Sequence, residues 1–76
     1  MSVEIRIPGL GAGMTEGTLV EWHQADGAAV AVGELLYTLE SEKTSQDIEA
    51  TEGGVLRRIG EEGEVYPVGE LIGVLE

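Results

Sequence analysis

Lys43 is the residue of this chain that most clearly offers covalent chemistry, because it is the only lysine among 76 residues. It stands between Glu42 and Thr44 in a chain with fifteen acidic residues and three arginines. A lysine amine can form a Schiff base, act as a general base or accept a group through a stable covalent bond. The first two roles need a desolvated lysine of lowered pKa. The third role needs an amine that another protein can reach.

The remaining residues with catalytic or ligating side chains form no recognisable set. His23 is the only histidine and there is no cysteine, so neither a triad nor a thiolate metal site is available. His23 is therefore expected on a strand surface. The turn Gly60–Glu64 has carboxylate oxygens but lacks the spacing of a calcium loop. Trp22 and Tyr37 are expected to be packing residues.

The stretch from Leu35 to Ala50 fits a β-hairpin with Glu42 and Lys43 at the centre of its turn. Side chains alternate between the two faces of a strand. One face then carries Leu35, Tyr37, Leu39, Ile48 and Ala50, with Gln46 as the exception. The other face carries Thr38, Glu40, Ser45, Asp47 and Glu49. This register predicts Lys43 at an exposed tip, in a type I turn that begins at Ser41.

An internal repeat indicates how the rest of the chain supports this hairpin. Residues 15–40 align without a gap over residues 51–76 at an offset of 36, and ten of the 26 positions are identical. The matched glycine pairs are Gly17/Gly53, Gly27/Gly63 and Gly33/Gly69. Glycine marks positions where the backbone needs positive φ or close approach, so the two halves are predicted to share turn geometry.

The fold class follows from short apolar runs that are separated by glycine-rich turns. The runs are VEIRI, TLVEW, AVAV, LLYTL, VLRRI and LIGVL, and none has a sustained helical period. We predict an all-β flattened barrel-sandwich of two four-stranded antiparallel sheets with pseudo-twofold symmetry, a barrel-sandwich hybrid. The expected core residues are Leu19, Trp22, Leu35, Leu39, Val55, Ile59, Leu71 and Leu75.

Length and charge limit the functional classes. Residues 1–76 make one small domain. The formal charge of −11 argues against nucleic acid and against anionic membranes as partners. No apolar run approaches the length of a membrane span, and the N-terminus lacks the pattern of a signal peptide. The absence of cysteine fits a reducing compartment.

At the predicted tip the sequence resembles a lipoyl domain, the carrier module of 2-oxo acid dehydrogenase complexes. The run Glu40-Ser41-Glu42-Lys43 matches the tip motif of that family, with Thr44 where alanine or valine is usual. The segments EGTLVEW, DGAAVAVGELL and VGELIGVL are also similar to family segments, so the likeness covers essentially the whole chain.

This resemblance implies that Lys43 carries lipoic acid in an amide bond, and that Glu40, Ser41, Glu42 and Thr44 are recognised around the tip. The domain itself would be a non-catalytic carrier, part of a dihydrolipoamide acyltransferase. The implied partners are a lipoate ligase or lipoyl transferase, a thiamine-dependent 2-oxo acid decarboxylase, the acyltransferase core and dihydrolipoamide dehydrogenase. The expected location is the cytoplasm of a bacterium. The chain is expected to be either a complete small protein or an N-terminal module of a longer acyltransferase, and its end directly after the last predicted strand favours the module.

Two further expectations concern the surroundings of Lys43. The acidic side chains beside the tip could steer the domain toward basic partner surfaces, or could simply keep the hairpin surface polar. They are Glu40, Glu42, Asp47 and Glu49. The loop Pro8–Met14 is placed near the lysine by the resemblance, although a plain glycine-rich connection explains its composition equally well.

Several alternatives stay open at this point. A biotin carboxyl carrier domain shares the implied fold and tip lysine, but that family usually has methionine on both sides of the lysine. A purely structural barrel-sandwich module would need no modifiable lysine, and an enzyme would need acidic residues gathered in one apolar cleft. The stretch GMTEGT resembles the pyruvate, branched-chain or acetoin type of complex more than the oxoglutarate type.

Overall fold

The computed structural model describes residues 2–11, 13–42 and 44–76, and eight short strands account for its regular structure. These strands are β1 (Val3–Arg6), β2 (Glu16–Trp22), β3 (Ala29–Val30), β4 (Leu35–Glu40), β5 (Ser45–Glu49), β6 (Gly54–Arg58), β7 (Glu64–Pro67) and β8 (Leu71–Leu75). Within these described ranges there is no helix that could cross a membrane.

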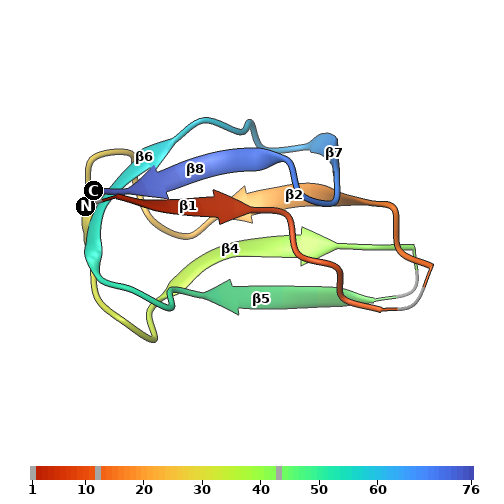
Figure 1. Ribbon diagram of the computed structural model, residues 1–76, viewed down its shortest axis with the longest axis horizontal. Helices are drawn as coiled ribbons and strands as arrows, with labels where there is room; N and C mark the ends of the chain where they lie inside the picture. Colours follow the sequence, from red (N-terminus) through yellow and green to blue (C-terminus); the bar gives the residue numbers. More distant parts are fainter. Residues whose placement is uncertain (1, 12, 43) are drawn as a thin grey trace.

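The strands form two antiparallel four-stranded sheets, which confirms the predicted fold class. One sheet has the order β1-β8-β6-β3 and the other the order β5-β4-β2-β7. Each strand of the first repeat has its counterpart four strands later, so the two orders are the same when β5, β4, β2 and β7 are replaced by β1, β8, β6 and β3. Figure 1 shows that β1 begins and β8 ends at one end of the molecule, while β4 ends and β5 begins toward the other end.

Turn geometry is shared between the repeats, as the matched glycines predict. Gly27 and Gly63 both have a φ of +86°, and Gly33 and Gly69 have φ values of +90° and +92°. Side chains with a Cβ rarely adopt this left-handed conformation, so glycine is the residue that these turns require. The repeat in the sequence therefore reflects a repeat in backbone conformation.

The two halves also hold each other through reciprocal hydrogen bonds. The backbone N–H of Trp22 donates to a carboxylate oxygen of Glu62 at 2.8 Å, and that of Arg58 donates to Asp26 at 2.8 Å. Both donors and both acceptors are separated by the repeat offset of 36 residues. Each turn carboxylate therefore binds the strand end of the other repeat.

The core lies between the sheets. At two positions the predicted core residue is wrong, and its neighbour in the sequence is buried instead. Leu35 is 40% exposed and Leu71 is half-buried, whereas Leu36 and Ile72 are buried. The pairing of β4 with β5 shifts between Leu35 and Tyr37, and that of β8 with β1 shifts across Ile72. Such a bulge adds one residue and reverses the expected facing of the side chains. Because the bulge recurs at the repeat offset, the same error occurs twice.

A third shift explains why Val55 and Ile59 are also wrong as core predictions. Val55 is half-buried and Ile59 is 55% exposed, while Leu56 is fully buried. The pairing of β2 with β4 contains a bulge at Val20, and the pairing of β6 with β8 has none. Leu19 therefore corresponds to Leu56 rather than to Val55. The other predicted core residues are buried as expected, namely Leu19, Trp22, Leu39 and Leu75.

Candidate functional site

The hairpin of β4 and β5 has the predicted register near its tip. Glu40 faces Ser45, Thr38 faces Asp47 and Tyr37 faces Ile48. The prediction fails only at the base, where Leu35 faces Glu49 instead of Ala50 because of the bulge. Lys43 itself lies outside the described residues, and so does the predicted turn type, which depends on it. The structure therefore describes the candidate attachment site through its neighbours on both sides.

Ser41 and Thr44 close the end of this hairpin. The backbone N–H of Ser41 donates to the carbonyl oxygen of Thr44 at 2.7 Å, and the Ser41 hydroxyl donates to the same oxygen at 3.2 Å. Ser41 is half-buried, whereas Glu42 and Thr44 are exposed. The two residues next to Lys43 are therefore open to solvent above a hydrogen-bonded base.

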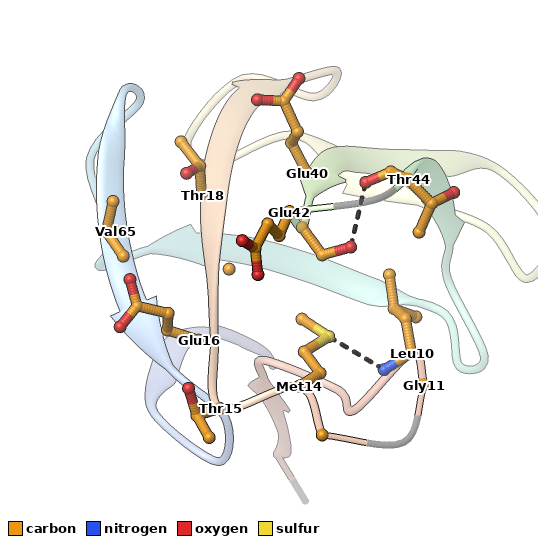
Figure 2. Close-up of a pocket in the computed structure, with 13 residues that line it drawn as sticks. Leu10, Gly11, Met14, Thr15, Glu16, Thr18, Glu40, Glu42, Thr44 and Val65 are labelled. Carbon is orange, nitrogen blue, oxygen red and sulfur yellow. Dashed lines mark hydrogen bonds between the residues drawn. The ribbon is translucent and has the colours of Figure 1, made fainter.

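A groove of about 810 Å³ lies beside the tip and brings the predicted recognition residues together. The groove is partly open to solvent. Its lining includes Glu40, Ser41, Glu42 and Thr44 from the hairpin, Leu10, Gly11, Gly13 and Met14 from the preceding loop, Thr15, Glu16, Gly17 and Thr18 around the start of β2, and Val65 from β7. Figure 2 shows the acidic side chains of Glu16, Glu40 and Glu42 around this space, with Leu10 and Met14 on the loop side.

The loop that precedes β2 is fixed at the groove by its own contacts, which agrees with the expected position of Pro8–Met14 near the tip. The backbone N–H of Leu10 donates to the Met14 sulfur at 3.1 Å, and that of Met14 donates to Gly11 at 3.2 Å. A Cβ at Gly17 would lie 3.0 Å from the Met14 methyl group and 2.8 Å from Leu39. The absence of a side chain at Gly17 therefore lets Met14 pack down onto the core.

The sheet that carries the hairpin is acidic throughout. Among the residues that the structure describes, the positive side chains of Arg6, Arg57 and Arg58 all lie on β1 and β6 of the other sheet. The hairpin sheet carries carboxylates on each of its strands: Glu16, Glu21, Glu40, Asp47, Glu49 and Glu64. Among the described residues, the charged side chains that border the groove are therefore carboxylates.

His23 is on the surface as expected, but it is not isolated. Its Nε2 lies 2.6 Å from the Thr38 hydroxyl, which in turn donates to Asp47 at 2.8 Å. Because the hydroxyl proton of Thr38 is used on Asp47, Nε2–H must be the donor to Thr38. The described residues hold no group of three metal-ligating side chains, and this row crosses an exposed sheet face. It links β4 and β5 to the end of β2 across this face.

Trp22 and Tyr37 pack against each other in the core, as predicted from the sequence. Their ring centroids are 5.4 Å apart at an interplanar angle of 60°, and Tyr37 is 1% exposed. Burial raises the pKa of the Tyr37 hydroxyl to about 12, because the protein interior disfavours the phenolate. The guanidinium of Arg58 lies 5.6 Å from the Trp22 ring, within the range of a cation–π contact.

Sequence reasoning missed the contribution of β2 and β7 to the groove. Thr18 pairs with Glu40 on one side and with Val65 on the other, which places all three on one row across the sheet. Glu16 and Gly17 precede Thr18 on the same strand and also line the groove. The signal was present in the segment EGTLVEW, but the order of strands in the sheet was needed to connect it with the tip.

Comparisons with known proteins agree with this geometry. The sequence model of the biotin and lipoyl attachment family, described as "Biotin-requiring enzyme", matches residues 3–75. The match spans all eight strands and both sides of the tip. It therefore applies to the whole fold and not to the tip motif alone.

Three curated relatives are acyltransferase components. The chain is 36% identical over 77 residues to the dihydrolipoyllysine-residue acetyltransferase component of the pyruvate dehydrogenase complex of Zymomonas mobilis. It is 37% identical to the succinyltransferase component of the 2-oxoglutarate dehydrogenase complex of Bacillus subtilis and 42% identical to the chloroplastic acetyltransferase component 4 of Arabidopsis thaliana, each over 73 residues. These matches cover 99%, 95% and 95% of this chain but 18%, 18% and 15% of the relatives. The chain therefore spans less than a fifth of their length.

Two solved structures share the fold. The lipoyl domain of the 2-oxoglutarate dehydrogenase complex of Azotobacter vinelandii matches with a TM-score of 0.82 at 31% identity, over 97% of this chain and 95% of that domain. A single-chain, multi-domain long-chain acyl-CoA carboxylase matches with a TM-score of 0.73 at 24% identity, over 97% of this chain and 7% of that protein. The second similarity concerns the fold alone.

Proposed function

The chain belongs to the biotinyl/lipoyl attachment family, and on this premise we propose that residues 1–76 form a non-catalytic carrier domain with a lipoyl group on Lys43. The main support is the position of the tip motif: its described residues end a hairpin, and they border a groove that the rest of the domain completes. The names of the curated relatives refer to a dihydrolipoyllysine residue and the Azotobacter domain is a lipoyl domain, which favours lipoic acid over biotin.

The residues around Lys43 fit such a group. The attachment needs one accessible primary amine, and the side chains on either side of it, Glu42 and Thr44, are exposed. The groove offers the apolar side chains of Leu10, Met14 and Val65 next to the tip, so an apolar arm attached there has a surface to contact. When bound, the lipoyl group supplies a disulfide that accepts an acyl group together with two electrons.

The contribution of the chain is presentation. Amide formation joins the lipoate carboxyl carbon to Nζ of Lys43 with overall loss of water, and it changes the formal charge from −11 to −12 because one of the four cations is removed. Tethering to a domain raises the local concentration of the carried group at each active site that the domain visits. We propose that these sites belong to a thiamine-dependent decarboxylase, an acyltransferase core and dihydrolipoamide dehydrogenase, in a bacterial cytoplasm.

The test is intact-mass measurement after co-expression with a lipoate ligase. We expect one lipoyl adduct on the wild-type chain and none on Lys43→Ala. An unmodified wild-type chain, or an adduct that persists in Lys43→Ala, would contradict the proposal. A biotinyl adduct on the natural protein would favour the biotin carrier instead.

A second variant asks whether the position of the lysine matters. Exchanging the two central residues, Glu42→Lys with Lys43→Glu, keeps composition and charge but moves the amine by one place along the turn. We expect loss of modification with an unchanged circular dichroism spectrum. Modification at the new position would mean that the ligase does not read the tip geometry that we propose.

The type of complex is a narrower proposal. The stretch GMTEGT favours the pyruvate, branched-chain or acetoin type, while the relatives include both acetyl- and succinyltransferase components at similar identity. The lipoylated domain should be offered to the purified decarboxylase of each type with its 2-oxo acid. Acylation by the oxoglutarate enzyme alone would reject this assignment and leave the carrier function intact.

A further inference from the structure

We propose that Ser41 is a positioning residue for the modification of Lys43, because its backbone N–H and its hydroxyl together hold the Thr44 carbonyl and so keep the base of the tip closed. This inference rests on the proposed function. It gives Ser41 a different role from its acidic neighbours Glu40 and Glu42, whose carboxylates are available to a visiting protein.

Two hydrogen bonds from one residue to one oxygen are the observation that carries the proposal. The N–H···O distance is 2.7 Å and the O–H···O distance is 3.2 Å, both to the Thr44 carbonyl. A carbonyl oxygen has two lone pairs, so the Thr44 carbonyl can accept both bonds from Ser41 at once. The bonds join the two residues that flank the Glu42–Lys43 pair, and they continue the register that pairs Glu40 with Ser45.

Local bonds matter at the described residues on both sides of Lys43. Glu42 and Thr44 are exposed, so burial contributes little to their position. The central Glu-Lys pair also lacks the glycine or asparagine that tight hairpin turns favour. The hydroxyl of Ser41 therefore adds a bond where the backbone preference of the turn is weak.

The same geometry argues against direct recognition of the hydroxyl by a ligase. Its single proton is directed at the Thr44 carbonyl, and Ser41 is half-buried at the edge of the groove. If a ligase binds only the closed tip, its apparent dissociation constant equals the intrinsic constant divided by the fraction of closed molecules. Loss of the hydroxyl should thus weaken binding and leave the bound reaction unchanged.

The experiment compares steady-state lipoylation of the wild-type chain with that of three variants. Ser41→Ala removes the hydroxyl and Ser41→Thr keeps it. Ser45→Ala removes an exposed hydroxyl from the same hairpin that is not part of the Ser41–Thr44 bonds. For Ser41→Ala we expect KM to rise with kcat unchanged, by a factor of up to about ten, which is the upper limit set by the loss of one exposed hydrogen bond. Ser41→Thr and Ser45→Ala should keep the wild-type KM.

Amide hydrogen exchange supplies a readout that does not depend on the ligase. After correction for intrinsic rates, the amide of residue 41 should exchange faster in Ser41→Ala by at least the factor seen in KM. Exchange of this amide requires its hydrogen bond to the Thr44 carbonyl to open. Equal KM and exchange in wild type and Ser41→Ala would overturn the proposal. A fall in kcat at constant KM, or no recovery in Ser41→Thr, would also overturn it. Absence of lipoylation in the wild-type chain would instead reject the proposed function.

Discussion

Tyr37 is the residue whose ionisation the fold opposes, and it lies in the strand that leads to the tip. It is buried against Trp22, and this burial raises the pKa of its hydroxyl from the ordinary value of 10.0 to about 12. The folded state therefore retains the phenol proton at pH values where an unfolded chain would release it. Folding is therefore less favourable at alkaline pH, where an unfolded chain would release this proton.

The stability of the domain should consequently fall between pH 10 and pH 12. A folded-state pKa above the unfolded value means that the stabilisation is complete below pH 10 and is lost as the pH rises toward 12. Two pKa units correspond to about 2–3 kcal/mol. Urea unfolding at several pH values should show this loss in wild type and in Tyr66→Phe, and a smaller loss in Tyr37→Phe. An equal loss in both variants would show that another group causes it.

Among the elements, the hairpin and the repeat were predictable from the sequence and the bulges were not. Strict alternation of side chains gave the correct pairing from Tyr37 to Glu40, and matched glycines gave the shared turns. A bulge is one extra residue whose presence depends on how a strand pairs with its neighbour in the sheet. Leu35 and Leu36 are chemically alike, so the sequence alone could not show which of them faces the core.

The bulge at Leu36 makes a direct prediction about stability. Leu36→Ala should lower the free energy of unfolding by about 2–5 kcal/mol, because it leaves a cavity at a side chain that is 3% exposed. Leu35→Ala is the matched control: this side chain is 40% exposed, so the cost should stay below about 1 kcal/mol. Urea denaturation monitored by Trp22 fluorescence measures both. Equal costs, or a larger cost at Leu35, would contradict the bulged register.

The candidate site was predictable only as far as a single element could reveal it. The tip residues are adjacent in sequence, so the motif from Glu40 to Thr44 identifies them together. The far wall of the groove comes from β2 and β7, and Val65 is separated from the tip by more than twenty residues. These parts meet through the strand order of the sheet, which local patterns do not specify.

At the scale of the whole molecule, the tip hairpin lies away from the ends of the first and last strands. The start of β1 and the end of β8 lie at one end of the molecule, and the described sides of the tip hairpin lie at the other (Figure 1). The described arginines lie on the other sheet, where Arg6 and Arg57 are ion-paired with Glu4 and Glu76, while every strand of the hairpin sheet carries at least one carboxylate. A net charge of −11 distributed in this way gives the domain a field that can orient it during an encounter.

The rate of lipoylation at low substrate concentration should therefore depend on ionic strength. Charge steering is screened by salt, since the Debye length falls from about 30 Å at 0.01 M to about 8 Å at 0.15 M. We expect kcat/KM to drop at least about threefold over this range, with kcat nearly constant. Glu40→Gln should lower the low-salt rate and flatten the dependence, because this carboxylate borders the groove. Glu52→Gln makes the same change in net charge in the turn between β5 and β6, and it should have a smaller effect. If Glu40→Gln and Glu52→Gln change the rate equally, only the total charge matters. If the rates of the wild type and of both variants do not depend on salt, the acidic surface serves solubility and does not guide the partner.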